Sequence, residues 1–202
     1  PPRSTLSSSS AASDVYKRQT LQLPQLDTFS GSIKYGYGKD PNYQEWAPGM
    51  INLIEMKLFW NPSDQLRVNF RLNQQNNKRP ENGSLVSSAT VPRLKIEYQL
   101  NESLFLRFVG QYNSSYRDSL NDSSREGDPI YFKNADGSYY RATKQESNNL
   151  QADFLFSYRP TPGTLVFVGY GSSLTEPERY RFNSLERQSD GFFIKLSYLY
   201  RL

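Results

Sequence analysis

The segment "QLRVNFRLNQ" (residues 65–74) alternates strictly between apolar and polar side chains. Its apolar positions are Leu66, Val68, Phe70 and Leu72, and its polar positions are Arg67, Asn69, Arg71 and Asn73. Successive side chains of a β-strand point to opposite faces of a sheet, so this period of two predicts a strand with one apolar and one polar face. Such a strand suits a sheet that lies between two different media.

Similar patterns recur along the chain, and together they predict about eight strands. The alternation is clear at residues 65–74, 91–100, 103–112, 150–159 and 191–202, and it is less regular at 30–38, 51–60 and 164–173. Each segment has about nine to thirteen residues, and a tilted strand needs about 9–11 residues to cross a bilayer.

The connections between these segments alternate in length. Short turns rich in Asn, Pro and Gly lie at 61–64, 101–103 and 160–163, and long polar loops lie at 40–49, 76–90, 118–146 and 176–188. Short turns at one end and long loops at the other are typical of outer-membrane barrels. Residues 20–202 are therefore predicted to form part of an all-β, antiparallel, up-and-down transmembrane β-barrel. The alternative is a soluble β-sandwich, which also has alternating strands and hairpins.

The start of the chain differs in composition from the rest. A back-translation of "SSAASDVYKRQ" (residues 9–19) resembles a transposon-end adaptor used in sequencing libraries, and residues 1–19 are predicted to be a non-native, disordered tail. The alternative is a Ser/Ala-rich linker. On the adaptor interpretation the natural N-terminus is missing, and the net charge falls from +4 to about +2. A nearly balanced charge argues against nucleic acid as a partner.

The composition excludes several kinds of chemistry. The chain has no Cys and no His, so disulfides, thiolate metal sites and Ser/His catalysis are all excluded. We therefore expect no catalytic residues, no metal and no cofactor. The chain has 15 Tyr and 12 Phe among many polar residues, which favours half-exposed strands.

The polar face is predicted to line the lumen of the barrel. Its residues are Lys57, Arg67, Asn69, Arg71, Arg93, Lys95, Glu97, Arg107, Gln111, Gln151, Asp153, Arg159, Lys195 and Arg201. Cations outnumber acids among them, which favours polar or anionic small solutes. Alternatively, these cations pair with carboxylates on further strands or on a plug. With so few acids to balance them in a narrow barrel, we expect an open sheet here rather than a closed eight-stranded barrel.

Aromatic side chains near the strand ends are predicted to form interfacial girdles. They are Trp60, Tyr98, Tyr112, Tyr158, Tyr170, Tyr198 and Tyr200. The last strand also has the pattern that the barrel assembly machinery reads, with Tyr198, Tyr200 and Leu202 as its insertion signal. The predicted surroundings are outer-membrane lipid, and the predicted location is the bacterial outer membrane.

Three stretches carry a resemblance to a known family. They are "VPRLKIEYQLNESLFLRFVGQYN" (91–113), "LQADFLFSYRPTPGTLVFVGYGSSLTEPERYRF" (150–182) and "SDGFFIKLSYLYRL" (189–202). They resemble the C-terminal outer-membrane barrel of the bacterial family called domain of unknown function 5916. The resemblance implies a larger barrel, usually fused to a family-9-like carbohydrate-binding domain that none of these residues matches.

Three functional hypotheses follow from these patterns. The first is a Gram-negative outer-membrane barrel fragment that acts as a membrane anchor or a porin-like solute pore. The others are a soluble carbohydrate-binding β-sandwich and a barrel enzyme whose catalytic residues lie in missing strands. In addition, "GDPIYFKNADGSYYRATKQ" (127–145) predicts a hairpin turning at "NADG", whose aromatic residues could stack on a sugar or a partner.

Overall fold

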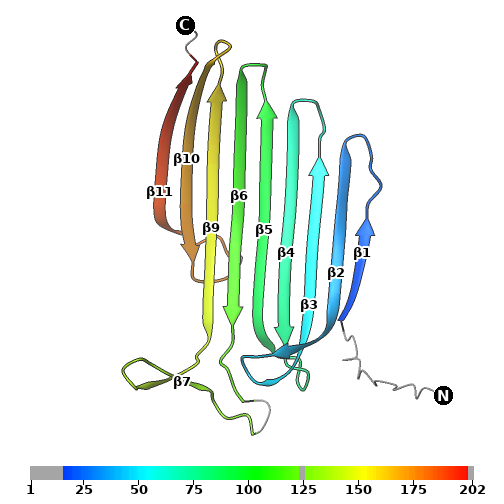
Figure 1. The fold of residues 1–202 in the computed structure, drawn as a ribbon, viewed down its shortest axis with the longest axis vertical. Coiled ribbons are helices and arrows are strands. Elements are labelled where there is room, and N and C mark those ends of the chain that lie inside the picture. Colours follow the sequence, from blue (N-terminus) through cyan, green and yellow to red (C-terminus); the bar gives the residue numbers. More distant parts are fainter. Residues whose placement is uncertain (1–15, 123–125, 200–202) are drawn as a thin grey trace, which may run out of the picture.

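The structure, a computed structural model, describes residues 16–122 and 126–199, and this part of the chain is all β. Nine strands form one antiparallel sheet in the order β1-β2-β3-β4-β5-β6-β9-β10-β11, and Figure 1 shows them side by side. The strands are β1 (Tyr16–Gln22), β2 (Phe29–Asn42), β3 (Ala47–Trp60), β4 (Leu66–Lys78), β5 (Leu85–Gln99), β6 (Leu104–Arg117), β7 (Tyr131–Lys133), β8 (Tyr139–Arg141), β9 (Gln145–Tyr158), β10 (Thr164–Glu176) and β11 (Glu186–Tyr198). The up-and-down antiparallel prediction is confirmed.

The predicted strands correspond to β2–β6 and β9–β11, and β1 is an addition. Its residues Tyr16–Gln19, predicted to be disordered, pair with β2 from Tyr16↔Gly38 to Gln19↔Tyr35. The reason is that a sheet edge offers free backbone N–H and C=O groups, which pair with almost any extended segment. Residues 1–15 lie outside the described part of the chain, and the adaptor origin of the tail stays a prediction.

The sheet is open. β1 and β11 are its two edges, and no backbone pairing joins them in the part of the chain that the structure describes. This confirms the expectation of an open sheet. The β-sandwich alternative is wrong for the described residues, because their second sheet is only the two-stranded β7–β8 hairpin. No helix in residues 16–122 and 126–199 is long and apolar enough to span a membrane.

The strands extend beyond their predicted ends, and the predicted long loops are correspondingly shorter. The segments 40–49 and 76–90 shrink to connections at 43–46 and 79–84. Beyond the apolar alternation, polar side chains continue the ladder: Asn77 donates to Ser87 Oγ at 2.8 Å, and Ser88 donates to Asn76 Oδ1 at 2.8 Å. Side-chain periodicity therefore underestimated the length of the backbone ladder.

The small buried core lies at the long-loop end of the sheet. Val86, Leu120 and Ala142 are buried together, with Ile130 packed against them. They hold the base of the β7–β8 hairpin, which turns at Gly137 (φ 87°) as "NADG" predicted. Elsewhere the described sheet is one layer, and Figure 1 shows no second layer over either face.

Candidate functional site

Strand register places the predicted lumen residues on one face of the sheet. Cross-strand partners share a face, and the partners run Lys57↔Arg71↔Arg93↔Gln111↔Gln151 in one row. The next row contains Asn69, Lys95 and Asp153, the row after it contains Arg67, Glu97 and Arg107, and the third contains Lys195. Arg159 directly follows β9 and donates to the Glu102 carbonyl at 3.0 Å. Arg201 lies outside the described residues.

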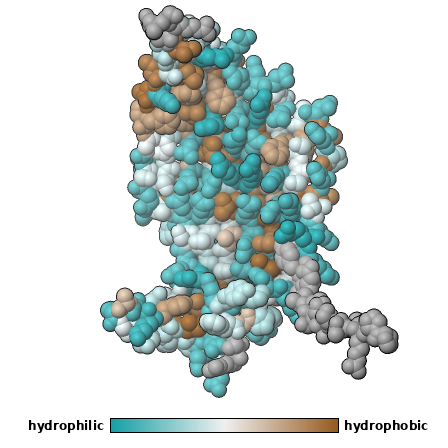
Figure 2. Space-filling view, in the orientation of Figure 1, coloured by the Kyte–Doolittle hydropathy of each residue, from teal (hydrophilic) through white to brown (hydrophobic). Residues whose placement is uncertain are grey.

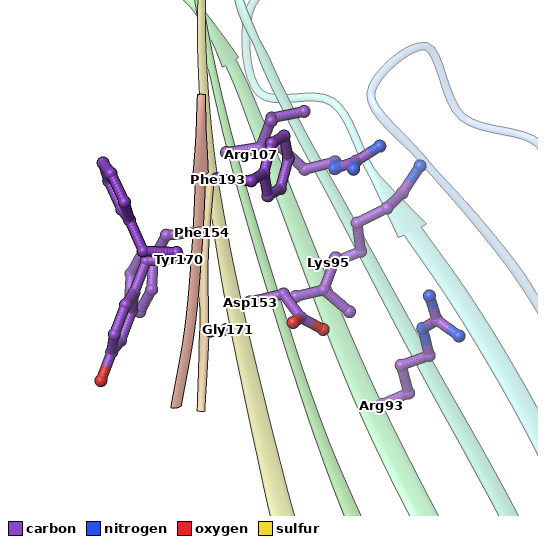
Figure 3. Close-up of a pocket in the computed structure, with 12 residues that line it drawn as sticks. Arg93, Lys95, Arg107, Asp153, Phe154, Tyr170, Gly171 and Phe193 are labelled. Carbon is purple, nitrogen blue, oxygen red and sulfur yellow. The ribbon is translucent and has the colours of Figure 1, made fainter. Parts of the chain in front are cut away.

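The polar face contains a groove of about 490 Å³ that extends over β5, β6, β9, β10 and β11. In Figure 3, Arg93, Lys95, Arg107 and Asp153 project to one side of these strands, while Phe154 and Tyr170 project to the other. Small residues on β10 make room on the groove side. A Cβ on Gly171 would lie 2.7 Å from Asp153 Oδ1, so any larger residue there would displace the Asp153 carboxylate.

Cations on this face have few anionic partners. Lys95 Nζ lies 2.9 Å from Glu97, and Lys34 Nζ lies 3.7 Å from Glu55. Among the described residues, the side chains of Lys57, Arg71 and Arg107 make no hydrogen bond and no ion pair. Two acids of this face, Glu55 and Glu97, are thus engaged by two other lysines.

The polar face is not polar throughout. Leu155, Phe167 and Phe193 share its rows, and none of them was among the predicted lumen residues. Figure 2 shows a mostly hydrophilic face with hydrophobic side chains gathered over the upper part of β10 and β11. The Phe193 ring lies over Gly169, where a Cβ would be only 2.0 Å from the ring. This corner of the face is lined by aromatic carbon.

The opposite face carries an apolar band, which is interrupted on β10 and β11 where Ser172 donates to Asp190 at 2.7 Å. One of its rows runs Val68↔Ile96↔Phe108↔Phe154↔Tyr170↔Phe192. The rings of Phe108 and Phe154 are 4.8 Å apart between centroids, but Phe154 is still 52 % exposed and Phe192 66 %. No described element covers this band.

The predicted girdle residues divide into two groups. Trp60, Tyr98, Tyr158 and Tyr198 lie at the short-turn end of the apolar face and are 38–68 % exposed. Tyr112 and Tyr170, which were also predicted to lie near strand ends, have other positions. Tyr170 lies in the middle of β10, and Tyr112 is buried beneath the rings of Tyr180 and Phe182 because the 177–185 loop folds back over it. Tyr200 and Leu202 lie outside the described residues.

Two buried glutamates, Glu45 and Glu176, hold the long loops in place through hydrogen bonds. Glu176 accepts the Tyr112 hydroxyl at 3.0 Å and the backbone N–H groups of Arg181 and Phe182. These bonds hold the loop although Tyr180 and Phe182 have positive φ. No spacing rule in the sequence relates these residues.

The second buried glutamate, Glu45, belongs to a cluster in which Arg79 joins three loops by hydrogen bonds and ion pairs. Arg79 Nε donates to fully buried Glu45 at 3.0 Å, and Arg79 Nη1 lies 2.9 Å from Asp118. Burial raises the pKa of Asp118, but hydrogen bonds from Arg79 and the Ser119 backbone outweigh it, so its pKa lies below the ordinary value. Sequence reasoning missed this cluster, since its members are 34 and 39 residues apart.

Acidic residues of the described chain form no group of three or more that could hold a metal ion. Comparisons with family models, with curated proteins and with solved structures give no match to this chain.

Proposed function

We propose that this chain forms part of the wall of a bacterial outer-membrane β-barrel, with its apolar face against lipid and its polar face toward a water-filled lumen. The observation that carries the proposal is the uncovered apolar band on a single-layered sheet. Domains in water bury such a face against a second layer. Lipid provides an apolar surrounding without a second layer of protein. The backbone groups of the strands are already paired with one another.

The height of the band supports this orientation. On β9 the apolar face extends from Leu150 to Tyr158 and ends at the polar Asn148. About nine residues at about 3.3 Å each reach about 26–30 Å along the strand. At a strand tilt of about 35–45° this length gives a height of about 19–24 Å, slightly less than the apolar band of about 25 Å in outer-membrane barrels. The next row, which contains Ser114 and Glu176, is polar.

The two ends of the apolar band have the features expected at the two membrane–water interfaces. Trp60, Tyr98 and Tyr158 lie just before the short turns, where an aromatic ring meets both apolar chains and water. The loops fastened by Glu45 and Glu176 lie at the opposite end. Short turns face the periplasm and long loops the exterior in known barrels.

The proposed barrel is wider than this sheet. In a bilayer both edges of the sheet need hydrogen-bonding partners, so β11 and, without the adaptor-derived residues of β1, the edge at β2 would pair with further strands. The barrel assembly machinery would first engage β11, which ends with Tyr198. We take solute passage as the primary role, because the groove leaves cations open to water. Anchoring of a carbohydrate-binding domain, implied by the family resemblance, is the second candidate.

The experiment compares two neighbouring positions on β9 that face opposite ways. Phe154→Trp and Leu155→Trp are made in a background in which Trp46 and Trp60 are replaced by Phe, and each chain is refolded into vesicles. We expect lipids brominated on their acyl chains to quench the fluorescence of the Phe154→Trp variant strongly and that of the Leu155→Trp variant only weakly. Iodide in the water should show the reverse order. Equal iodide quenching of the two variants would refute a lipid-facing band.

Two further measurements test the remaining parts of the proposal. Residues 20–202 should require detergent or lipid to stay monodisperse, and a monodisperse monomer in plain buffer would contradict the membrane assignment. Single-channel recordings of the complete barrel divide pore from anchor. Absence of conductance would eliminate solute passage and leave the anchor.

A further inference from the structure

Three cations are direct neighbours across three strands of the polar face. Lys57 on β3 is paired with Arg71 on β4, and Arg71 is paired with Arg93 on β5. Directly opposite side chains have Cβ atoms about 4.5–5.5 Å apart, and like charges at that spacing destabilise a sheet. We name Lys57, Arg71 and Arg93 the cation row.

The sheet itself does not neutralise this row. Within the described residues Lys57 and Arg71 make no ion pair, and the one hydrogen bond of Arg93 goes to the neutral amide of Gln111 at 3.4 Å. On the same face Glu55 and Glu97 contact Lys34 and Lys95, and Asp153, which lines the larger groove, makes no ion pair with the row among the described residues. Within the described sheet the repulsion of the row is not relieved, and an anionic ligand would relieve it.

Two hollows of the polar face meet at the row. Phe59, Asn69, Arg71, Arg93 and Lys95 line a hollow of about 290 Å³, and Arg93 and Lys95 also line the larger groove. Arg107 brings a further cation into that groove. The cations thus border open space of the size that a small solute fills.

We propose that the cation row, with Lys95 and Arg107 beside it, is a binding site for a soluble oxyanion that carries two or more phosphate-like groups. Guanidinium groups bind such groups in a bidentate fashion, and Arg71 and Arg93 are close enough to share one. The row spans two strand spacings, about 9–10 Å, which suits a ligand with several anionic groups. The proposal deepens the proposed function, on which it rests for access of the solute through the lumen.

The experiment uses the full 202-residue chain refolded in zwitterionic detergent micelles. Inorganic tripolyphosphate is titrated by calorimetry at constant ionic strength, against chloride as the reference anion. Arg71→Gln with Arg93→Gln should weaken binding about 100-fold, about tenfold for each guanidinium removed. Arg71→Lys with Arg93→Lys should weaken it less, because charge remains and only the fork of the guanidinium is missing.

The matched control removes the same charge elsewhere. Arg159→Gln with Lys195→Gln, at the end of β9 and on β11, should change binding by less than about threefold. If this control weakens binding as much as the row variant does, net charge alone explains the binding and the site is refuted. Lack of tripolyphosphate binding by the unmodified chain also refutes it, with far-ultraviolet circular dichroism verifying the fold of each variant.

Failure of this site and failure of the membrane assignment give different results. Selective tripolyphosphate binding, together with equal iodide quenching of the Phe154→Trp and Leu155→Trp variants, would support the site and refute the lipid-facing band. Lipid quenching of the Phe154→Trp variant without tripolyphosphate binding would do the opposite.

Discussion

The link between Arg79 and Glu45 yields the sharpest stability prediction. Arg79→Met keeps much of the length of the side chain and removes its charge and its donors. Glu45 is fully buried and would lose its cation, while Asp118 and the Ser119 carbonyl would each lose a donor. Breaking a buried ion pair by removing one partner costs about 3–5 kcal/mol. The loss falls on the loop end, where these residues meet.

A single backbone amide reports on this cluster. The N–H of Asn121 donates to Glu45 Oε1 at 3.1 Å, so its hydrogen exchange follows opening of the loops. A loss of about 3–5 kcal/mol should accelerate exchange at Asn121 by about two to three and a half orders of magnitude. NMR-detected exchange on the chain in detergent micelles measures the rate residue by residue.

The control is an exposed pair in the same region. Arg181 contacts Glu178 at 2.6 Å, but both side chains are more than half exposed. Such surface pairs contribute about 0–1 kcal/mol, so Arg181→Met should leave exchange at Asn121 nearly unchanged. If the two variants exchange at the same rate there, burial of the Arg79 pair is not what holds the loops, and the reasoning is wrong.

Three further predictions concern other contacts. The pKa of Asp118 lies below its ordinary value of 3.8, so its contribution to loop stability is full above that value and is lost as the pH falls through the lower folded pKa. A carboxyl-carbon NMR titration should place the midpoint below 3.8, and a midpoint at or above it would contradict the pair. Tyr112→Phe removes the hydroxyl that donates to Glu176 and accepts a loop N–H at 3.1 Å, at a cost of about 1–3 kcal/mol. Proteolysis within 177–185 should accelerate. An unchanged cleavage rate would show that the hydrogen bonds of the Tyr112 hydroxyl do not hold the loop. Gly31→Ala would place a Cβ 2.7 Å from a carbonyl oxygen of β3 and should destabilise the sheet by about 1–3 kcal/mol, whereas Gly191→Ala enters open space and should be nearly neutral. Urea unfolding in micelles compares the two variants. Equal midpoints would show that β2 and β3 move apart enough to accommodate the added Cβ without loss of stability.

Sequence periodicity was sufficient for the strands and for their two faces. Leu66, Val68, Phe70 and Leu72 lie on one face, and Arg67 and Arg71 lie on the other, as the alternation in 65–74 predicted. The reason is local: side chains of an extended backbone must alternate whatever the rest of the chain does. The short turns were equally accessible, because Asn, Pro and Gly determine tight connections through their own backbone preferences.

Contacts between distant segments were decided only by the tertiary structure. Tyr112 fits the alternation of β6, yet the 177–185 loop buries it, and no local pattern encodes that return. Polar strand ends near Asn76 and Ser88 were taken for loop, because backbone pairing needs no apolar alternation. Likewise, Glu45 and Arg79 meet only after β3 and β4 have paired.

The cation row depends both on the local alternation of side chains and on the tertiary pairing of the strands. Alternation alone assigned Lys57, Arg71 and Arg93 to the polar face, since it depends on one strand at a time. Register then made them direct neighbours, because the tight turn between β3 and β4 and the pairing of β4 with β5 determine which residues stand opposite each other. The sequence by itself determined which charges face the same side, and only the assembled sheet decided that these three lie close enough to act on one ligand.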